Sequence, residues 1–322
     1  MTEAVNWKTL IFGVHEPAMA WVKIFSALLS LARQSSSPVT LHDATVTPDR
    51  LLSEAAWELW EAFPLTAVKT SASLKEWTRQ SPGKAVLILD ALSLRELSLL
   101  LGAAEARGIQ PLEVKVTGSE CPSTTDHFAK AIGLSSRSAL ANDGKPGTLS
   151  LFDGNCFTDV LSMPFEDCAI PPAPNIVVWH SWLDDLIHLQ LKNPDQIASI
   201  SSTVLQSDGF WSFINKLRQG RALVITSDHG YAVSKRFSSE IEEPAAIETL
   251  RKTFGASRNK AVADIGPKKF MPPIVMTHNN QQIIMGQRKW KVQGGFPNVC
   301  HGGMTLLEVA VPWIEFPALI IF

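Results

Sequence analysis

Four short apolar segments between residues 85 and 225 constrain the fold of this chain more than any other feature. Each is shorter than a typical helix and is closed by polar or turn-forming residues, which is typical of the buried strands of a parallel sheet. Helical stretches such as Phe210–Leu217 lie between them, so we expect strands and helices to alternate with right-handed crossovers. The pattern predicts an α/β fold. The expected strands are Ala85–Leu89, Leu112–Val116, Ile176–Trp179 and Ala222–Ile225.

The segments outside this alternating region have a different character. Residues 1–80 read as mostly helical and contain tryptophan at five positions. Residues 232–290 are rich in Pro, Lys and Arg and do not continue the alternation of strands and helices, which indicates an inserted cap. Further on, Thr305 and Glu308 have the spacing of a capping box at the start of a helix, and we expect Pro312 to end that helix.

The composition excludes several classes of protein. With 322 residues, 45% of them hydrophobic, the chain can bury a large core, and its net charge of −2 does not by itself indicate a polyanion partner. The four cysteines form no CxxC pair, which argues against a disulfide framework or a zinc ribbon and fits a reducing cytosol. The apolar segment 18–31 carries Lys23 and is too short to span a bilayer. We therefore expect a soluble cytoplasmic protein without a membrane association.

Polar side chains follow each of the four expected strands. In open α/β sheets the binding crevice lies beyond the carboxyl ends of the strands, so these positions are the informative ones. Asp-His-Gly directly after an apolar strand is the strongest signal, because a purely structural account of both side chains is strained. The other signals also have structural explanations. The polar residues that follow the four expected strands are Asp90, Ser123 to Thr125, His180, Asp184, His188, Asp228 and His229.

Each weaker signal leaves two interpretations open. Asp90 is either a ligand or a helix cap, and Asp184 with His188 is either a metal-binding pair on one helix face or a solvated surface pair. The hydroxyl-rich segment 122–125 is either a turn or the source of a nucleophile. Together, carboxylates, imidazoles and a hydroxyl at one sheet edge suit two divalent ions about 4 Å apart, which can stabilise the attacking and leaving oxygens of a phosphoryl displacement. A hydroxyl held there is a candidate nucleophile.

The order of these motifs resembles the alkaline phosphatase superfamily. Within it, the words LILDAL, ITSDHGY and HGGMTLLEVAVPWI resemble the PglZ domain, over about residues 84–318. The resemblance implies an alkaline phosphatase-like α/β sandwich with a central, mostly parallel sheet flanked by helices. We expect a helical N-terminal region at 1–80 and a PglZ domain at 81–322, with the basic cap inserted at about 232–290.

The resemblance also implies roles for individual residues. Thr125 matches the second hydroxyl of the family's P-[ST]-x-T pattern and would be the nucleophile, with Ser123 as the alternative if the register differs by two. Zinc is the favoured metal, with manganese or magnesium as alternatives. One metal would be bound by Asp184, His188 and His301, and the second by Asp90, Asp228, His229 and the hydroxyl of Thr125.

One departure from the family pattern concerns an arginine. PglZ domains usually place Arg three residues after the first Asp, whereas this chain has Ser93 there and Arg95 two residues later. The role of that arginine in substrate binding or packing is therefore in doubt. The implied ligand set is complete, which argues against an inactive relative.

PglZ domains are components of BREX-type phage-defence systems, so the resemblance implies other subunits of a defence complex as partners and the N-terminal helices as their candidate binding region. We expect a metal-dependent phosphodiesterase or nuclease. The alternatives are a non-catalytic metal-binding scaffold and a small-molecule phosphomonoesterase of the same superfamily.

The basic cap favours a nucleic-acid or other phosphodiester substrate, because residues 231–300 are net positive by six whereas the rest of the chain is net negative. Trp290 is a candidate for stacking on a base or for a core position, and Tyr231 for lining the pocket. We expect His180 and His278 to be structural or to contact ligands indirectly. The basic residues of 231–300 are at positions 235, 236, 251, 252, 258, 260, 268, 269, 288, 289 and 291, and the acids at 240, 242, 243, 248 and 264.

Overall fold

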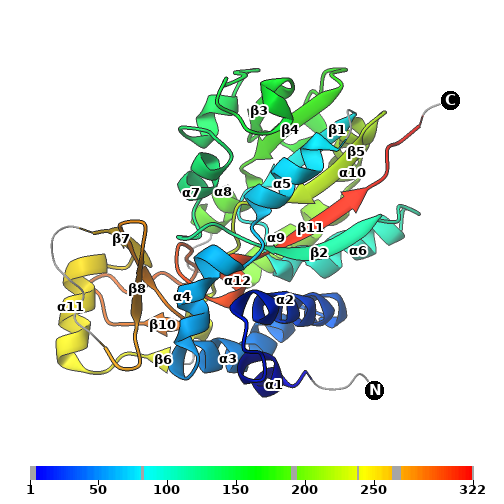
Figure 1. The fold of residues 1–322 in the computed structure, drawn as a ribbon. Coiled ribbons are helices and arrows are strands. Elements are labelled where there is room, and N and C mark those ends of the chain that lie inside the picture. Colours follow the sequence, from blue (N-terminus) through cyan, green and yellow to red (C-terminus); the bar gives the residue numbers. More distant parts are fainter. Residues whose placement is uncertain (1–4, 81–82, 190–193, 238, 263–269, 321–322) are drawn as a thin grey trace.

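A six-stranded sheet forms the centre of the computed structural model (Figure 1), in the order β2-β11-β5-β1-β4-β3. Strand β11 is antiparallel to both of its neighbours, and the other pairs are parallel. The strands are β1 Lys84–Leu89, β2 Glu113–Gly118, β3 Phe157–Leu161, β4 Asn175–His180, β5 Ala222–Thr226 and β11 Ala310–Phe316. The structure describes residues 5–80, 83–189, 194–237, 239–262 and 270–320.

This architecture confirms the predicted α/β fold with a mostly parallel central sheet. All four predicted strands are present within two residues of the expected bounds. Strands β3 and β11 were not predicted from the sequence. Each contains polar residues, such as Asp159 and Glu315, that interrupt the apolar run.

The expectation that Pro312 ends a helix is wrong. Helix α12 (Leu306–Val309) is shorter than expected, and Pro312 lies inside β11. Its carbonyl oxygen, which points the same way as the missing N–H, accepts a hydrogen bond of 2.8 Å from Thr226 Oγ1 at the end of β5. Pairing of β11 with β5 begins only at Ile314, so the proline removes no strand hydrogen bond on that side.

Helices cover both faces of the sheet. Leu87 and Leu89 of β1 face a large core shared with α2, α6, α9 and α10, whereas Val86 and Ile88 face a smaller core under α5 and α7. None of the helices in the described part of the chain has the length and apolarity needed to cross a membrane. The helices that follow β1 are α6 Leu97–Glu105, α7 Thr125–Ala131, α8 Trp182–Leu189, α9 Pro194–Gln206 and α10 Asp208–Arg218, with short 3-10 turns at Leu94–Glu96, Arg137–Leu140, Phe152–Gly154, Phe165–Asp167 and Ser234–Arg236.

The N-terminal region is helical, as the sequence predicts. Trp21, Trp60 and Phe63 form an aromatic cluster with centroid separations of 4.9–5.9 Å, and they belong to the same large core as one face of the sheet. The region packs beside β2, β11 and α12 (Figure 1). The division into domains at residue 80 stays a prediction. The helices are α1 Trp7–Phe12, α2 Pro17–Gln34, α3 Pro38–Glu54, α4 Trp57–Thr66 and α5 Thr70–Arg79.

The expected cap contains small sheets and one helix, which lie to one side of the central sheet (Figure 1). They have a core of their own, in which Leu250, Phe254, Ile284 and Trp290 are buried. Positions 264, 268 and 269 of the basic cap lie outside the described residues. The elements are β6 Ser239–Glu240, α11 Pro244–Phe254, β7 Asn259–Ala261, β8 Val275–His278, β9 Gln281–Ile284 and β10 Arg288–Lys289.

Asp49 of α3 connects the N-terminal helices to both the cap and α12. Its buried carboxylate accepts hydrogen bonds from the backbone N–H of Leu306 (2.8 Å) and from Gln287 Nε2 (2.9 Å). Burial raises the pKa of Asp49 to about 7. The ionised form therefore opposes folding, and its contribution makes stability fall as the pH rises from about 4 to about 7.

Replacing Asp49 by Asn should remove part of that fall. Asn keeps an acceptor for Leu306, and the amide of Gln287 can turn to offer Oε1, which has no hydrogen-bond partner among the described residues. We expect the melting temperature of Asp49→Asn, relative to the parent, to rise between pH 5 and pH 8. Thermal melts across this range are the measurement, with Asp43→Asn on an exposed position of the same helix as the control. Parallel curves for Asp49→Asn and the parent would contradict the assignment.

Candidate metal centre

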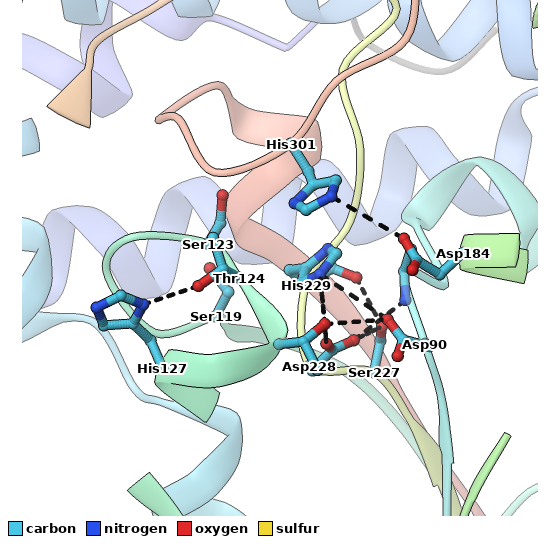
Figure 2. Close-up of polar contacts among 12 residues, drawn as sticks. Asp90, Ser119, Ser123, Thr124, His127, Asp184, Ser227, Asp228, His229 and His301 are labelled. Carbon is cyan, nitrogen blue, oxygen red and sulfur yellow. Dashed lines mark hydrogen bonds and ion pairs between the residues drawn. The ribbon is translucent and has the colours of Figure 1, made fainter. Parts of the chain in front are cut away.

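The predicted site residues converge at the carboxyl edge of the central sheet (Figure 2). Asp90 follows β1, and Asp228 and His229 follow β5, which is the neighbour of β1. Parallel strands end at the same edge, so these side chains meet there. The remaining residues come from helix ends and a loop. They are Thr125 at the start of α7, Asp184 and His188 on α8, and His301 ahead of α12.

Asp90, Asp228 and His229 form the first group, and all three are buried. His229 Nε2 lies 3.3 Å from Asp228 Oδ2 and 3.9 Å from Asp90 Oδ1. The hydroxyl of Thr125 lies among them, 2.9 Å from Asp228 Oδ2, 3.4 Å from Asp90 Oδ1 and 3.3 Å from His229 Nε2. The structure thus brings together the four residues that the resemblance assigns to one metal.

Asp184, His188 and His301 form the second group. Asp184 and His188 are one turn apart on α8, with His188 Nε2 at 3.4 Å and His301 Nε2 at 4.0 Å from Asp184 Oδ1. The ring of His301 stacks on that of His229 at a centroid distance of 4.5 Å, so the two groups adjoin. The side chain of His188 is 58% exposed, which places solvent on this side of the site.

Neighbouring groups hold the first group in place. Ala91, directly after Asp90, has a left-handed backbone with φ of 62°, and its N–H donates to Asp228 Oδ1 at 3.1 Å. Trp179 Nε1, on the adjacent strand, donates to Asp90 Oδ2 at 3.0 Å. His229 Nδ1 lies 2.9 Å from the carbonyl oxygen of Gly230, so Nε2 is the ring nitrogen that faces the carboxylates.

The electrostatics of the site reflect several like charges in a buried place. Burial and the carboxylates of Asp228 and Asp184 raise the pKa of Asp90 well above its usual range, although an ion pair with Arg137 opposes this. Burial also raises the pKa of Asp184. Burial and the neighbouring His229 lower the pKa of His301 to about 3, so its imidazole is neutral near pH 7, which is the form that binds metals.

This set of donors fits divalent cations. Within each group the potential ligand atoms lie within 4.8 Å of one another, and mixed carboxylate oxygens and imidazole nitrogens suit zinc or manganese. Asp184 Oδ1 and His301 Nδ1 are buried and have no hydrogen-bond partner in the described part of the chain. Buried polar atoms are seldom left in this way, and a bound cation would satisfy the carboxylate oxygen.

Arg137 is the site residue that sequence reasoning missed. It lies in the 3-10 turn Arg137–Leu140, and its guanidinium forms an ion pair with Asp90. Burial by itself would lower the pKa of Arg137, but the nearby carboxylates of both groups raise it. The guanidinium is thus a built-in counter-charge for the cluster. No motif in the sequence marks this position.

The loop that carries His301 is fixed from two sides. Ser123, which is buried, donates a hydrogen bond to the carbonyl oxygen of Gly303 (2.8 Å) and accepts one from the N–H of Gly302 (3.1 Å). Its hydroxyl is therefore engaged by the loop, whereas that of Thr125 faces the carboxylates. On the other side, a Cβ at Gly302, where φ is 92°, would lie 2.1 Å from Asn259 Nδ2. The positive φ favours glycine at this position, and any larger residue would also displace the Asn259 side chain.

Glu308 connects the same loop to the cap. The Glu308 half of the predicted capping box is present, since the Glu308 carboxylate accepts a hydrogen bond from the N–H of Thr305 (3.0 Å), and it also accepts one from the N–H of Gly303 (3.0 Å). Arg258 of the cap donates to both carboxylate oxygens, at 2.8 and 3.0 Å, and both side chains are fully buried. The sequence indicated the capping box, but it gave no signal for Arg258 as a partner.

The structure decides two expectations about aromatic residues. Tyr231 does not line the metal groups, because it is buried and its hydroxyl donates to Glu96 Oε1 at 2.7 Å. Trp290 occupies the core position, with Nε1 donating to the carbonyl oxygen of Gly255 at 3.0 Å, and is not available for stacking on a base. Both aromatic side chains are therefore part of the buried core.

The remaining expectations concern His180, His278 and Arg95. His180 is structural, since its ring stacks on Phe165 at 4.1 Å and is buried. His278 belongs to β8 and to neither metal group. Arg95, which follows the position of the family's usual arginine, is buried with its guanidinium over the ring of Tyr231 and bonded to the carbonyl oxygen of that residue. Its role here is in packing.

Comparisons with known proteins find a family model that matches part of the chain. Residues 170–316 match the family model described as the BREX system PglZ alkaline phosphatase-like domain. This confirms the resemblance over a shorter range than the expected 84–318. The curated proteins contain no match to the chain.

Several solved structures are similar to the chain at low sequence identity. Phosphonoacetate hydrolase from Sinorhizobium meliloti 1021, in complex with phosphonoformate, is 12% identical, with a TM-score of 0.44 over 74% of this chain and 91% of that one. Ectonucleotide pyrophosphatase / phosphodiesterase 5 from mouse is 12% identical, with a TM-score of 0.41 over 74% and 88% of the two chains. An inactive variant of the mouse protein in complex with AMP is 13% identical, with a TM-score of 0.44 over 74% and 92%.

Replacing Glu308 by Gln should destabilise the protein strongly. The charge of Arg258 would stay buried without its partner, which typically costs about 3–5 kcal/mol of unfolding free energy. The measurement is urea unfolding, with Glu113→Gln as the control, because its ion pair with Lys115 is exposed and contributes at most about 1 kcal/mol. Equal losses in the two variants would contradict the assigned role of Glu308.

Replacing Arg137 by Ala should have an effect that depends on metal. Without metal the guanidinium compensates the carboxylate cluster, and bound cations would take over that role. We expect Arg137→Ala to lower the melting temperature by several degrees in EDTA and by less with zinc. Arg50→Ala, which breaks an exposed ion pair with Glu54, is the control and should show no such difference. An identical loss of stability for Arg137→Ala in both conditions would count against a metal site beside Asp90.

Proposed function

Residues 170–316 match the PglZ alkaline phosphatase-like family model, and from this premise we propose that the protein is a metal-dependent phosphodiesterase or nuclease. The observation that carries the proposal is the position of the Thr125 hydroxyl, 2.9 Å from Asp228 Oδ2 and within 3.4 Å of both Asp90 and His229. A hydroxyl among two carboxylates and an imidazole is suited to nucleophilic catalysis when the site holds cations.

In this proposal two divalent ions, with zinc favoured and manganese or magnesium as alternatives, are held by the two groups. Bound divalent cations supply Lewis-acid stabilisation of the attacking and leaving oxygens. One would be held by Asp184, His188 and His301. The other would be held by Asp90, Asp228, His229 and the hydroxyl of Thr125.

The residues of the chain prepare the nucleophile. The first turn of α7 fixes Thr125, and Asp228 accepts its hydroxyl proton in a hydrogen bond, so a lone pair of Oγ1 is free to face the phosphorus. Attack would form a bond between phosphorus and Oγ1 and break the bond to the leaving alcohol. Water would then hydrolyse the threonine ester and restore the hydroxyl. Arg137 is available to balance negative charge on the substrate, since its side chain is 29% exposed.

The biological setting belongs to the same proposal. The family description names the BREX system, which supports a role in phage defence, in the cytoplasm, together with other subunits of a complex. The N-terminal helices are the proposed region for those partners. Phe12, Met19 and Val22 of α1 and α2 are about half exposed there, which gives a protein partner apolar surface to cover. Loss of a co-purifying subunit on changing these three side chains to Ser would test this part.

Hydrolysis of model substrates tests the catalytic proposal. With zinc or manganese, we expect turnover of bis-p-nitrophenyl phosphate and of short DNA to exceed that of p-nitrophenyl phosphate. Thr125→Ala and Asp228→Ala should lower kcat by at least about a thousandfold. Thr124→Ala is the matched control, because the hydroxyl of Thr124 bonds to His127 and not to the carboxylates. Its turnover should stay near that of the parent.

Other outcomes would overturn this function. Turnover of the monoester alone would indicate a phosphomonoesterase. No turnover with any of the three metals, with retained partner binding in Thr125→Ala, would indicate a metal-binding scaffold. Equal loss of activity in Thr124→Ala and Thr125→Ala would remove Thr125 as the nucleophile.

A further inference from the structure

The cap contains a basic groove of about 390 Å³ that the metal centre does not use. Three lysines line it, from two separate segments of the cap. The partly exposed Phe296 is the accessible aromatic side chain of its lining, with its ring centroid 5.0 Å from that of the buried Trp290, and Asn298 also lines it. We define the basic groove by these residues and by Lys235, Lys289 and Lys291.

The strand around β10 explains why the lysines gather there. Side chains alternate along an extended chain, so Lys289 and Lys291 lie on one face while Arg288 and Trp290 lie on the other. Trp290 is buried in the core of the cap, and Arg288 points toward Glu54 of α3, 4.0 Å away. The opposite face therefore presents two lysines to the groove, and Lys235 joins them from the turn after His229.

The described residues around the basic groove do not balance its charge. Among the residues that the structure describes, none of the three lysines takes part in an ion pair, and no Asp or Glu lines the groove. Three uncompensated cations within one cavity repel one another, and they attract an anion with several charges more strongly than a single carboxylate or phosphate.

A two-glycine turn leaves the rim of the basic groove open. Gly294 and Gly295 have φ of 83° and 86°, and no atom lies within 4 Å of a Cβ built on either. The chain can make this turn without strain only with glycine, and the backbone there stays accessible. Next to it, Phe296 offers an aromatic surface beside the lysines, which is a combination that suits a nucleotide base and its phosphate.

Two segments that line the basic groove continue along the chain to the metal centre. Ala232 pairs with Cys300 in an antiparallel bridge, and farther along, the N–H of Lys235 donates to the carbonyl oxygen of Asn298 at 3.2 Å. One strand of this pair leads back to His229, and the other leads on to His301. At the rise of an extended chain, Asn298 is about 10 Å from His301.

We propose that the basic groove binds the phosphate backbone of a single-stranded nucleic acid and presents the strand to the metal centre. The inference deepens the proposed function. It rests on that function for the choice of a phosphate polymer over a carboxylate polymer as the ligand of the groove. Lys235, Lys289 and Lys291 contact successive phosphates, and Phe296 contacts a base. These residues determine the affinity for a polymer and leave the chemical step at Thr125 unchanged.

The test compares binding of a long substrate with turnover of a small one. A fluorescein-labelled single-stranded 20-mer DNA is titrated in EDTA, which prevents cleavage, and anisotropy is followed at several salt concentrations. We expect K235Q/K289Q/K291Q to bind more weakly and to lower the slope of log K against log salt by about two, from roughly 0.7 for each lost phosphate contact. The same variant with metal should hydrolyse bis-p-nitrophenyl phosphate at the parent rate.

The matched control is K8Q/K23Q/R33Q, which removes the same charge from exposed positions of the N-terminal helices. It should bind the DNA like the parent. Parent-like binding by the groove variant, or an equal loss in the control, would overturn the proposal. Competition by a polyglutamate peptide as effective as that by DNA would replace it with an acidic protein partner. DNA binding that depends on the groove lysines, without turnover of the diester by the parent protein, would support the groove proposal and contradict the catalytic proposal instead.

Discussion

The buried carboxylate of Glu308 is the interaction on which the arrangement of the site depends. It accepts four hydrogen bonds, from the N–H groups of Gly303 and Thr305 and twice from Arg258. A buried carboxylate is costly unless each oxygen is satisfied and its charge is paired, and both conditions hold here. Because Gly303 is two residues after His301, the same carboxylate fixes a proposed metal ligand, a short helix and the cap. The cap is thus part of the support of the site and not an accessory to it.

A second feature of the molecule is the concentration of acids that are harder to ionise than usual. Burial raises the pKa values of Asp49, Glu96 and Asp90, and each lies between the N-terminal helices and the sheet edge or within the metal centre. Such groups lower the stability of the folded protein near neutral pH. For Asp90 the energetic cost of a buried carboxylate is consistent with a site built for cations, because the ion pair with Arg137 offsets that cost only in part. Functional sites commonly retain this kind of unfavourable charge.

Local signals in the sequence predicted the fold class, and the resemblance to the PglZ domain assigned the members of the two groups. Apolar runs predicted β1, β2, β4 and β5, and the polar residues behind them converge for the simple reason that parallel strands end together. The parts that were missed depend on contacts between distant segments. Strand β11 is stabilised by its neighbours although it contains Pro312, and Arg137 reaches Asp90 from a turn without a motif. Neither could be inferred from a window of the sequence.

The residues of the candidate site are not all within the range of the family match. The structure explains how residues inside and outside that range come together. Residues 170–316 include Asp184, Asp228 and His301, whereas Asp90 and Thr125 lie before that range. The central sheet bridges this separation, because β1 lies between β4 and β5 and carries Asp90 to the same edge. The N-terminal helices are also part of this arrangement, because Asp49 accepts a hydrogen bond from the backbone N–H of Leu306. A fragment limited to the matched range would lack β1 and the hydroxyl of Thr125, so the candidate site is a property of the sheet as a whole.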